Sequence, residues 1–190
     1  MRSDNQQHDR FLELLEPELP RLQAFCQKLT GDPETGDDLM QDALYDAWRG
    51  FGKLREATSF KSWLYQITVY RYRTNLRKLR KRTESILPLS GDVVDERQQR
   101  LQLARKRLNI AMASLSAKDR ALVTLHELEG WSYAEMATTF GKSEGALRTR
   151  LTRCRRQMQE TLRRYLEKTD EDLYLKGVCQ EWIVAKQKRS

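Results

Sequence analysis

Arginine and threonine side chains recur along residues 143–158 at the spacing of one helix face. At about 100° per residue, one side of such a helix takes the apolar residues Leu147, Leu151, Cys154 and Met158. The opposite side takes Gly145, Arg148, Thr149, Thr152, Arg153 and Arg156. Arginine pairs with guanine or phosphate, threonine contacts bases and thymine methyl groups, and glycine permits close approach. Because a merely solvated helix usually mixes both signs of charge, this face predicts DNA binding.

The residues before this helix complete a helix-turn-helix pattern. Ser132-Tyr-Ala-Glu135 is a capping box that opens a short helix. Ala137 lies four residues before Gly141, so a small side chain allows the helices to cross closely and glycine allows the tight turn. Ser143 can cap the second helix. We expect Met136, Ala137 and Phe140 to be buried.

Three carboxylates on one helical turn are compatible with metal-dependent catalysis. Asp37, Asp38 and Asp42 could hold a metal ion in a nuclease, but no histidine or basic partner accompanies them. The chain has two histidines and three cysteines, and the cysteines have no ligand spacing. We therefore expect reduced thiols, no metal, no cofactor and no enzymatic activity.

An acidic helix favours a protein partner. Residues 30–46 contain six acids and no base. With Leu39, Ala43 and Ala47 directed inwards, the outer face takes Asp38, Gln41, Asp42, Tyr45 and Arg49. A carboxylate face repels DNA, so it suits either a protein partner or solvent alone.

Aromatic and basic residues alternate along residues 59–82. Phe60, Trp63, Tyr65, Tyr70 and Tyr72 lie among lysines and arginines, a pattern typical of surfaces that hold single-stranded nucleic acid. Phe60 and Trp63 also fall on an apolar stripe, and the tyrosines are candidates for the core too, so Trp63 can belong to the core as well as to the edge of a DNA site.

Composition and periodicity predict an all-α protein with two small helical domains. The 190-residue chain has a formal net charge of +8, which favours a polyanionic partner. Apolar residues recur at helical spacing almost throughout, except around residues 83–100, which we interpret as a linker. The second half restarts with a stripe of Leu101, Ala104, Leu108, Ala111 and Leu115, and we expect it to form a compact four-helix unit. The predicted boundaries are 1–82, 83–100, 101–166 and 167–190.

Three motifs in order give the chain a family resemblance. "GDPETGDDLMQDALYDAW", "SFKSWLYQI" and "LSAKDRALVTLHELEGWSYAEMATTFGKSEGALRTRLTRCRRQM" resemble the two conserved blocks of extracytoplasmic-function (ECF) sigma factors of the bacterial sigma-70 superfamily. The resemblance implies a region 2-like domain at 1–82, a linker, and a region 4-like helix-turn-helix domain at 101–166. It implies a sigma factor that directs core RNA polymerase to promoters and assists their opening.

The resemblance also implies roles for particular residues. Asp38, Gln41, Asp42 and Tyr45 would contact core RNA polymerase. The helix from Ser143 would read the −35 element of promoter DNA. The −10 element would be captured by the loop from Gly52 to Ser59 and held during melting by the basic helix, with contacts from Lys53, Ser59, Lys61, Trp63, Arg71, Arg73 and Arg77. Family members usually have Asn where this chain has Tyr70. An anti-sigma factor is a further expected partner.

Alternatives remain open at this stage. A stand-alone helix-turn-helix regulator would read DNA without docking on polymerase. Residues 167–190 carry an amphipathic stripe of Leu175, Val178, Cys179, Trp182 and Ile183, which could pack on the protein itself, dock a partner or lie on a membrane surface. No stretch has the length of a membrane span or the apolar core of a signal peptide, so we expect a cytoplasmic protein.

Overall fold

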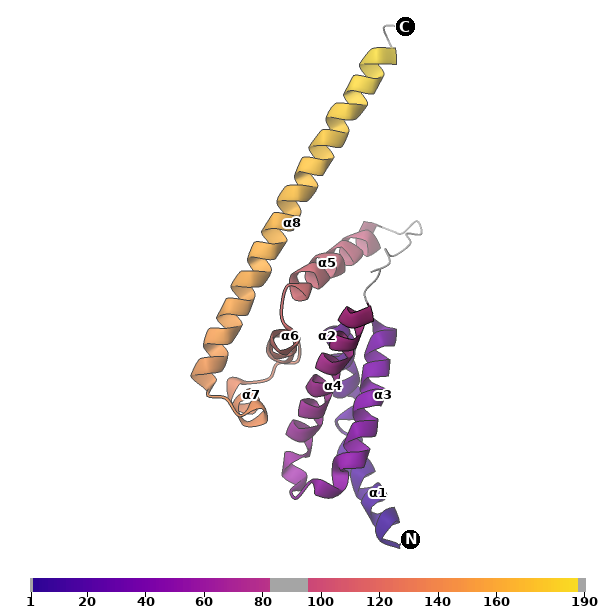
Figure 1. The fold of residues 1–190 in the computed structure, drawn as a ribbon, viewed down its shortest axis with the longest axis vertical. Helices are drawn as coiled ribbons and strands as arrows, with labels where there is room; N and C mark the ends of the chain where they lie inside the picture. Colours follow the sequence, from indigo (N-terminus) through magenta and orange to yellow (C-terminus); the bar gives the residue numbers. More distant parts are fainter. Residues whose placement is uncertain (1, 83–95, 188–190) are drawn as a thin grey trace. The chain divides into compact units, whose positions relative to one another are not determined.

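The described residues fold into helices, as seen in a computed structural model (Figure 1). The structure describes the backbone of residues 2–82 and 96–187, and the side chains of residues 5–78 and 101–169. The described elements are α1 (Arg2–Leu15), α2 (Leu19–Thr30), α3 (Pro33–Gly50), η1 (Phe51–Lys53), η2 (Ala57–Ser59), α4 (Phe60–Arg82), α5 (Glu96–Ala113), α6 (Ala117–Val123), η3 (Thr124–Leu128), α7 (Tyr133–Phe140) and α8 (Glu144–Gln187). No strand occurs in these ranges, which confirms the all-α prediction.

By its contacts the chain divides into two compact units that cut across the predicted domains. One unit joins residues 1–93 to residues 115–154, and the other joins residues 94–114 to residues 155–190. The predicted linker, 83–100, lies mostly outside the described residues, but α5 already begins at Glu96. The domain boundaries and the four-helix unit that the sequence suggests therefore stay predictions.

Helices α2, α3 and α4 form the centre of the first unit. The Asp32 side chain caps α3 by accepting a hydrogen bond from the Thr35 N–H at 2.8 Å, and Pro33 occupies the first turn, where a helix does not need its N–H. The inward residues of α3, among them Leu39, Ala43 and Ala47, are buried as expected. Gly36 faces α2, where an added Cβ would lie 2.5 Å from the Gln27 Cα. That glycine lets the two helices touch backbone to backbone.

The first unit also packs α4 against α6 and α7. The Tyr65 and Trp131 rings lie 4.7 Å apart between centroids, and both side chains are buried. Thr139 on α7 donates to the Ser62 hydroxyl at 3.0 Å, and its carbonyl accepts a hydrogen bond from Gln66. Segments more than 60 residues apart in sequence therefore share one apolar core.

The stripe predicted along α5 is only partly buried. Ala111 and Leu115 are buried, but Leu101 is 54% exposed and Leu108 is 43% exposed. Leu128 is 40% exposed and ends the π-helical turn η3. A wider turn rotates the side chains that follow it away from the α-helical register, which explains why the simple period fails there.

The helix predicted to read DNA and residues 167–187 form one continuous helix. The backbone of α8 runs from Glu144 to Gln187, although a separate element was predicted from residue 167. The side chains of the predicted amphipathic stripe lie outside the described residues, so their role stays a prediction.

Candidate nucleic-acid and protein interfaces

The helix-turn-helix forms as the sequence predicts, but of the three residues expected to be buried only Met136 is, whereas Ala137 and Phe140 are half-buried. The Ser132 Oγ accepts from the Glu135 N–H at 3.1 Å, and Glu135 Oε2 accepts from the Ser132 N–H at 2.8 Å, which closes the capping box. The Ser132 backbone N–H and hydroxyl hold the pKa of Glu135 below its usual value. Gly141 makes the turn with φ of 60°, a left-handed conformation that favours glycine. Ser143 then caps α8 by accepting from the Ala146 N–H at 3.3 Å.

The predicted reading face of α8 is exposed along its whole length. Leu147, Leu151 and Cys154 are buried on the inner side. The outer side exposes Gly145, Arg148, Thr149, Thr152, Arg153 and Arg156. The hydroxyls of Thr149 and Thr152 donate to backbone carbonyls four residues back, at 3.0 Å each. The threonine methyl groups are therefore the parts best placed for base contacts.

Acids do accompany two of the arginines, which corrects the sequence interpretation. Arg148 pairs with Glu144 at 3.2 Å, and Arg156 lies 3.9 Å from Glu160. Both pairs are one helical turn apart and solvent-exposed, so each contributes only a few tenths of a kcal/mol. DNA phosphates can displace such weak pairs. Arg153 has no ion pair among the described residues, and it is the arginine of this face most readily available to DNA.

An ion pair fixes α8 against α6. Asp119 accepts hydrogen bonds from Arg150 and from the Ser116 hydroxyl. Burial alone would raise the pKa of Asp119, but these hydrogen bonds outweigh it and lower the pKa below its usual value. Burial, with the nearby Asp119 charge, raises the pKa of Cys154 to about 11. Cys154 is thus an unreactive core thiol, as expected.

Most of the aromatic residues of α4 are not available for stacking on bases. Phe60, Tyr65 and Tyr72 are buried, so they belong to the core, as the apolar stripe predicts for Phe60, and are not available to stack on bases in this conformation. Trp63 is half-buried and packs against the rings of Phe51 and Phe60 at centroid distances of 6.4 and 6.0 Å. Tyr70 is 65% exposed. The alternation in sequence reflects a helix with several buried sides.

The basic residues predicted for the −10 element differ in their availability. Lys61 lies 3.5 Å from Glu135 and 4.5 Å from the Trp131 ring centroid. Arg71 donates from Nε to Asp46 at 2.7 Å. Lys53, Ser59 and Arg77 are exposed, and Arg73 is half-buried.

The acidic face of α3 is exposed where the sequence predicts. Asp38, Gln41 and Tyr45 are exposed, with Tyr45 at 61%. Asp42 is half-buried and accepts a hydrogen bond from the Asn75 side chain at 3.1 Å.

Asp37 does not belong to that face. It accepts hydrogen bonds from Gln23 at 3.0 Å and from Gln27 at 2.9 Å. Two neutral amides therefore bind the carboxylate that a metal-dependent nuclease would need. Within the part of the chain that the structure describes, no three His, Cys, Asp or Glu side chains form a metal-binding group.

Family comparisons identify both halves of this arrangement. Residues 14–83 match the family model described as "Sigma-70 region 2", and residues 111–158 match the one described as "Sigma-70, region 4". The chain belongs to the sigma-70 family. The order of the two regions agrees with the sequence motifs, and the ECF resemblance is confirmed by relatives that carry that description.

Known relatives of this sigma-70 family chain include two curated proteins and a solved structure. The chain is 29% identical to a probable RNA polymerase sigma factor, RfaY, of Xanthomonas campestris, over 78% of this chain and 44% of the relative. It is 31% identical to the ECF sigma factor SigM of Mycobacterium tuberculosis, over 68% and 65%. The chain thus spans about half to two thirds of these relatives' length.

The solved structure is sigma factor RpoE in complex with the anti-sigma factor NepR from Bartonella quintana. It aligns with a TM-score of 0.56 at 29% identity, over 80% of this chain and 96% of that one. The two-region helical fold is therefore shared.

Several residues of this sigma factor had no local signal in the sequence. Trp131, Thr139 and Gly36 hold together segments that are distant in sequence. Asn75 positions the Asp42 carboxylate from the neighbouring helix. Only contacts between helices could reveal these roles.

Within residues 2–82 and 96–187, the helices include none with the length and apolar character of a membrane span.

Proposed function

We propose that this chain is an RNA polymerase sigma factor that directs core RNA polymerase to specific promoters and assists promoter opening. The observation that carries this proposal is the presence, in one chain, of an exposed helix-turn-helix reading face on α8 and an exposed acidic face on α3. A stand-alone regulator needs the first face but has no use for the second.

The reading face of α8 recognises the −35 element in this proposal. Arg153 and Arg148 supply guanine or phosphate contacts, and the threonine methyl groups contact thymine. Phosphate contacts from the arginines position the helix, whereas base contacts specify the sequence. Gly145, at which an added Cβ would meet open space, lets DNA approach the backbone.

The segment from Lys53 to Arg77 binds the −10 element. Lys53 and Ser59 line the exposed turns before α4, and the basic residues of α4 attract the backbone of the opening strands. Trp63 is half-buried against Phe51 and Phe60, so it supports the turns from behind and presents only an edge. To contact phosphate, Arg71 must release its hydrogen bond to Asp46. If it does not, its role is to position the Asp46 carboxylate.

The acidic face of α3 docks on core RNA polymerase through Asp38, Gln41, Asp42 and Tyr45. Tyr45 is a large exposed aromatic side chain beside carboxylates, and such side chains commonly act as interface anchors. The Asn75 hydrogen bond holds Asp42 in place before docking, which lowers the cost of ordering it.

An anti-sigma factor is a further partner, and the cytoplasm is the site of action. The support for an anti-sigma partner is that the similar RpoE chain was solved with its own anti-sigma factor, NepR. Sigma factors are initiation factors and not enzymes, which agrees with the lack of a catalytic constellation in the sequence.

Promoter selection from a pooled library tests the proposal. Purified chain is assayed by gel shift and runoff transcription, with and without core polymerase. We expect transcripts, and specific binding to both promoter elements together, only with core polymerase. Specific binding of the chain alone to a palindromic site, unchanged by core polymerase, would instead identify a stand-alone regulator. Metal-dependent cleavage of the DNA would identify a nuclease.

A further inference from the structure

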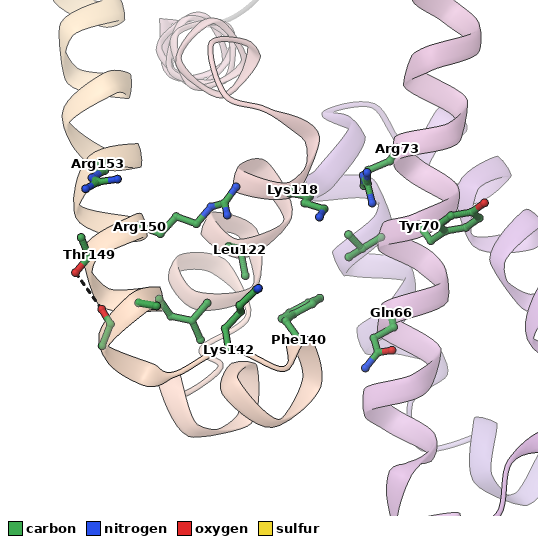
Figure 2. A pocket seen from close by; sticks show the side chains of 14 residues that line it. Gln66, Tyr70, Arg73, Lys118, Leu122, Phe140, Lys142, Thr149, Arg150 and Arg153 are labelled. Carbon is green, nitrogen blue, oxygen red and sulfur yellow. Dashed lines mark hydrogen bonds between the residues drawn. The ribbon is translucent and has the colours of Figure 1, made fainter.

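A cationic cavity of about 670 Å³ lies in the first unit, between α4 on one side and α6, α7 and the start of α8 on the other (Figure 2). Its volume falls within the range of small-molecule sites, about 300–1,000 Å³. Arg73 and part of the reading face of α8 line it, but their proposed DNA contacts do not explain an open space between these helices. We propose that it is a binding site for a small anionic amphiphile, a molecule with a ring-sized apolar body and at least one negative group.

The charge of the cavity defines the polar part of this ligand. Five basic residues line it, and none of the described residues that line it is acidic: Arg73, Lys118, Lys142, Arg150 and Arg153. Arg150 is already bound to Asp119. The other four have no ion pair among the described residues. Four cations from separate elements, without an ion pair among the described residues, lie around one space and together attract an anion.

The apolar side chains that line the cavity define the apolar part of this ligand. Val69, Leu122, Phe140 and Leu147 line the cavity, and Figure 2 shows Phe140 and Lys142 directed into the same space. The Tyr70 ring is directed away from it. An inorganic anion alone would leave this apolar surface in contact with water. An amphiphile covers the apolar surface and places its charge beside the basic side chains.

The walls of the cavity come from both sigma regions. Gln66 and Arg73 belong to the region 2 segment, and Lys142 and Arg153 belong to the region 4 segment. A ligand that fills the cavity therefore stabilises the contact between α4 and α7. It also covers part of the reading face, since Gly145, Thr149 and Arg153 line the cavity.

This arrangement gives the ligand a regulatory effect, which rests on the proposed function. The −10 and −35 elements lie about 25 base pairs apart, or roughly 85 Å at 3.4 Å per base pair. Regions in side-chain contact cannot bind both elements at once. A ligand that prefers the closed arrangement shifts the population away from the DNA-binding form, so it would act as an inhibitor.

Fluorescence titration of the full chain with two matched probes tests the site. The probes are 8-anilinonaphthalene-1-sulfonate and N-phenyl-1-naphthylamine, which share a skeleton but differ in the sulfonate. We expect the sulfonate probe to bind one site at least ten-fold more tightly than the neutral probe. Equal affinities would overturn the proposal, because the cations would then have no role.

Two variants place the probe in this cavity. Lys118→Ala/Lys142→Ala removes two exposed cations, and Ala146→Phe fills the space while keeping every charge. We expect each to weaken sulfonate binding at least ten-fold. The matched control, Arg163→Ala/Arg164→Ala, removes two exposed arginines elsewhere on α8 and should bind normally. If both cavity variants bind the sulfonate probe as tightly as the control does, and their circular dichroism is unchanged, the cavity is not the binding site.

A final experiment tests the ligand site independently of the proposed function. We expect the sulfonate probe to reduce −35 DNA binding by the wild type but not by Ala146→Phe. Probe binding without an effect on DNA overturns the regulatory part alone. Absence of polymerase-dependent transcription in probe-free reactions overturns the proposed function and leaves the binding result intact.

Discussion

The Tyr65 ring on α4 packs against the Trp131 ring, with centroids 4.7 Å apart, at the junction of the two sigma-70 regions. Trp131 is 5% exposed and Tyr65 is fully buried. The Lys61 ammonium covers the other part of the Trp131 ring, 4.5 Å from its centroid. Trp131 therefore anchors the loop before the helix-turn-helix to the helix predicted to melt DNA.

Replacing this anchor should destabilise the first unit strongly. We expect Trp131→Ala to lower the free energy of unfolding by about 3–5 kcal/mol, since it removes a buried aromatic side chain. Urea denaturation followed by circular dichroism measures the change. Tyr70→Ala, at a residue that is 65% exposed, is the control and should cost less than about 1 kcal/mol. A loss of the same size in both variants would contradict the anchor role.

Substitutions at two glycines distinguish an effect on helix packing from an effect on the approach of DNA. Gly36→Ala places a Cβ 2.5 Å from the Gln27 Cα and should lower stability by about 1–3 kcal/mol through overpacking. Gly145→Ala meets open space, so it should leave the melting temperature unchanged yet weaken −35 binding. Thermal melts and gel shifts measure the two effects. Normal DNA affinity for Gly145→Ala would exclude close backbone approach at that position.

Arg153 should carry more DNA affinity than Arg148. Arg148→Ala also releases Glu144 from an ion pair at 3.2 Å, whereas Arg153 has no such pair among the described residues. We expect Arg153→Ala to cost about 1–3 kcal/mol of −35 affinity if it contacts a base. If it contacts phosphate instead, the salt dependence of binding falls by about one unit. An unchanged affinity and slope at several salt concentrations would remove Arg153 from the interface.

The acidic face should govern polymerase affinity but not −35 recognition. We expect Asp38→Ala/Gln41→Ala to weaken binding to core polymerase at least ten-fold, about 1.4 kcal/mol. Its affinity for −35 DNA as a free protein should stay the same. Glu34→Ala, an exposed acid in the first turn of the same helix, serves as the control. Equal loss in both variants would point to general charge rather than to this face.

Acidification should weaken the contact between α6 and α8. The pKa of Asp119 is lowered in the folded protein, so its contribution is present above its unfolded pKa of about 3.9 and is lost as pH falls through the folded value. Asp119→Asn should therefore lower the melting temperature at pH 6, and the difference from wild type should shrink by pH 3. Melts of both proteins across this range test it, with exposed Asp9→Asn as the control. A constant difference would mean that the charge is irrelevant.

The sequence by itself determined the local features of this protein. Caps at Asp32, Ser132 and Ser143, and the left-handed turn at Gly141, depend on residues within a few positions of one another. The same holds for the exposed reading face of α8, because one helical period places its residues. These features could be predicted because both partners of each interaction lie in one short stretch of chain.

Only the tertiary structure decided which residues of α4 remain available. This helix touches α3, α6 and α7, so no single apolar stripe predicts that Tyr72 is buried while Tyr70 is exposed. Likewise the Asn75–Asp42 hydrogen bond and the cationic cavity join residues from different helices. Helical periodicity tells which residues share a face, but the number of faces covered depends on how many neighbours pack around the helix.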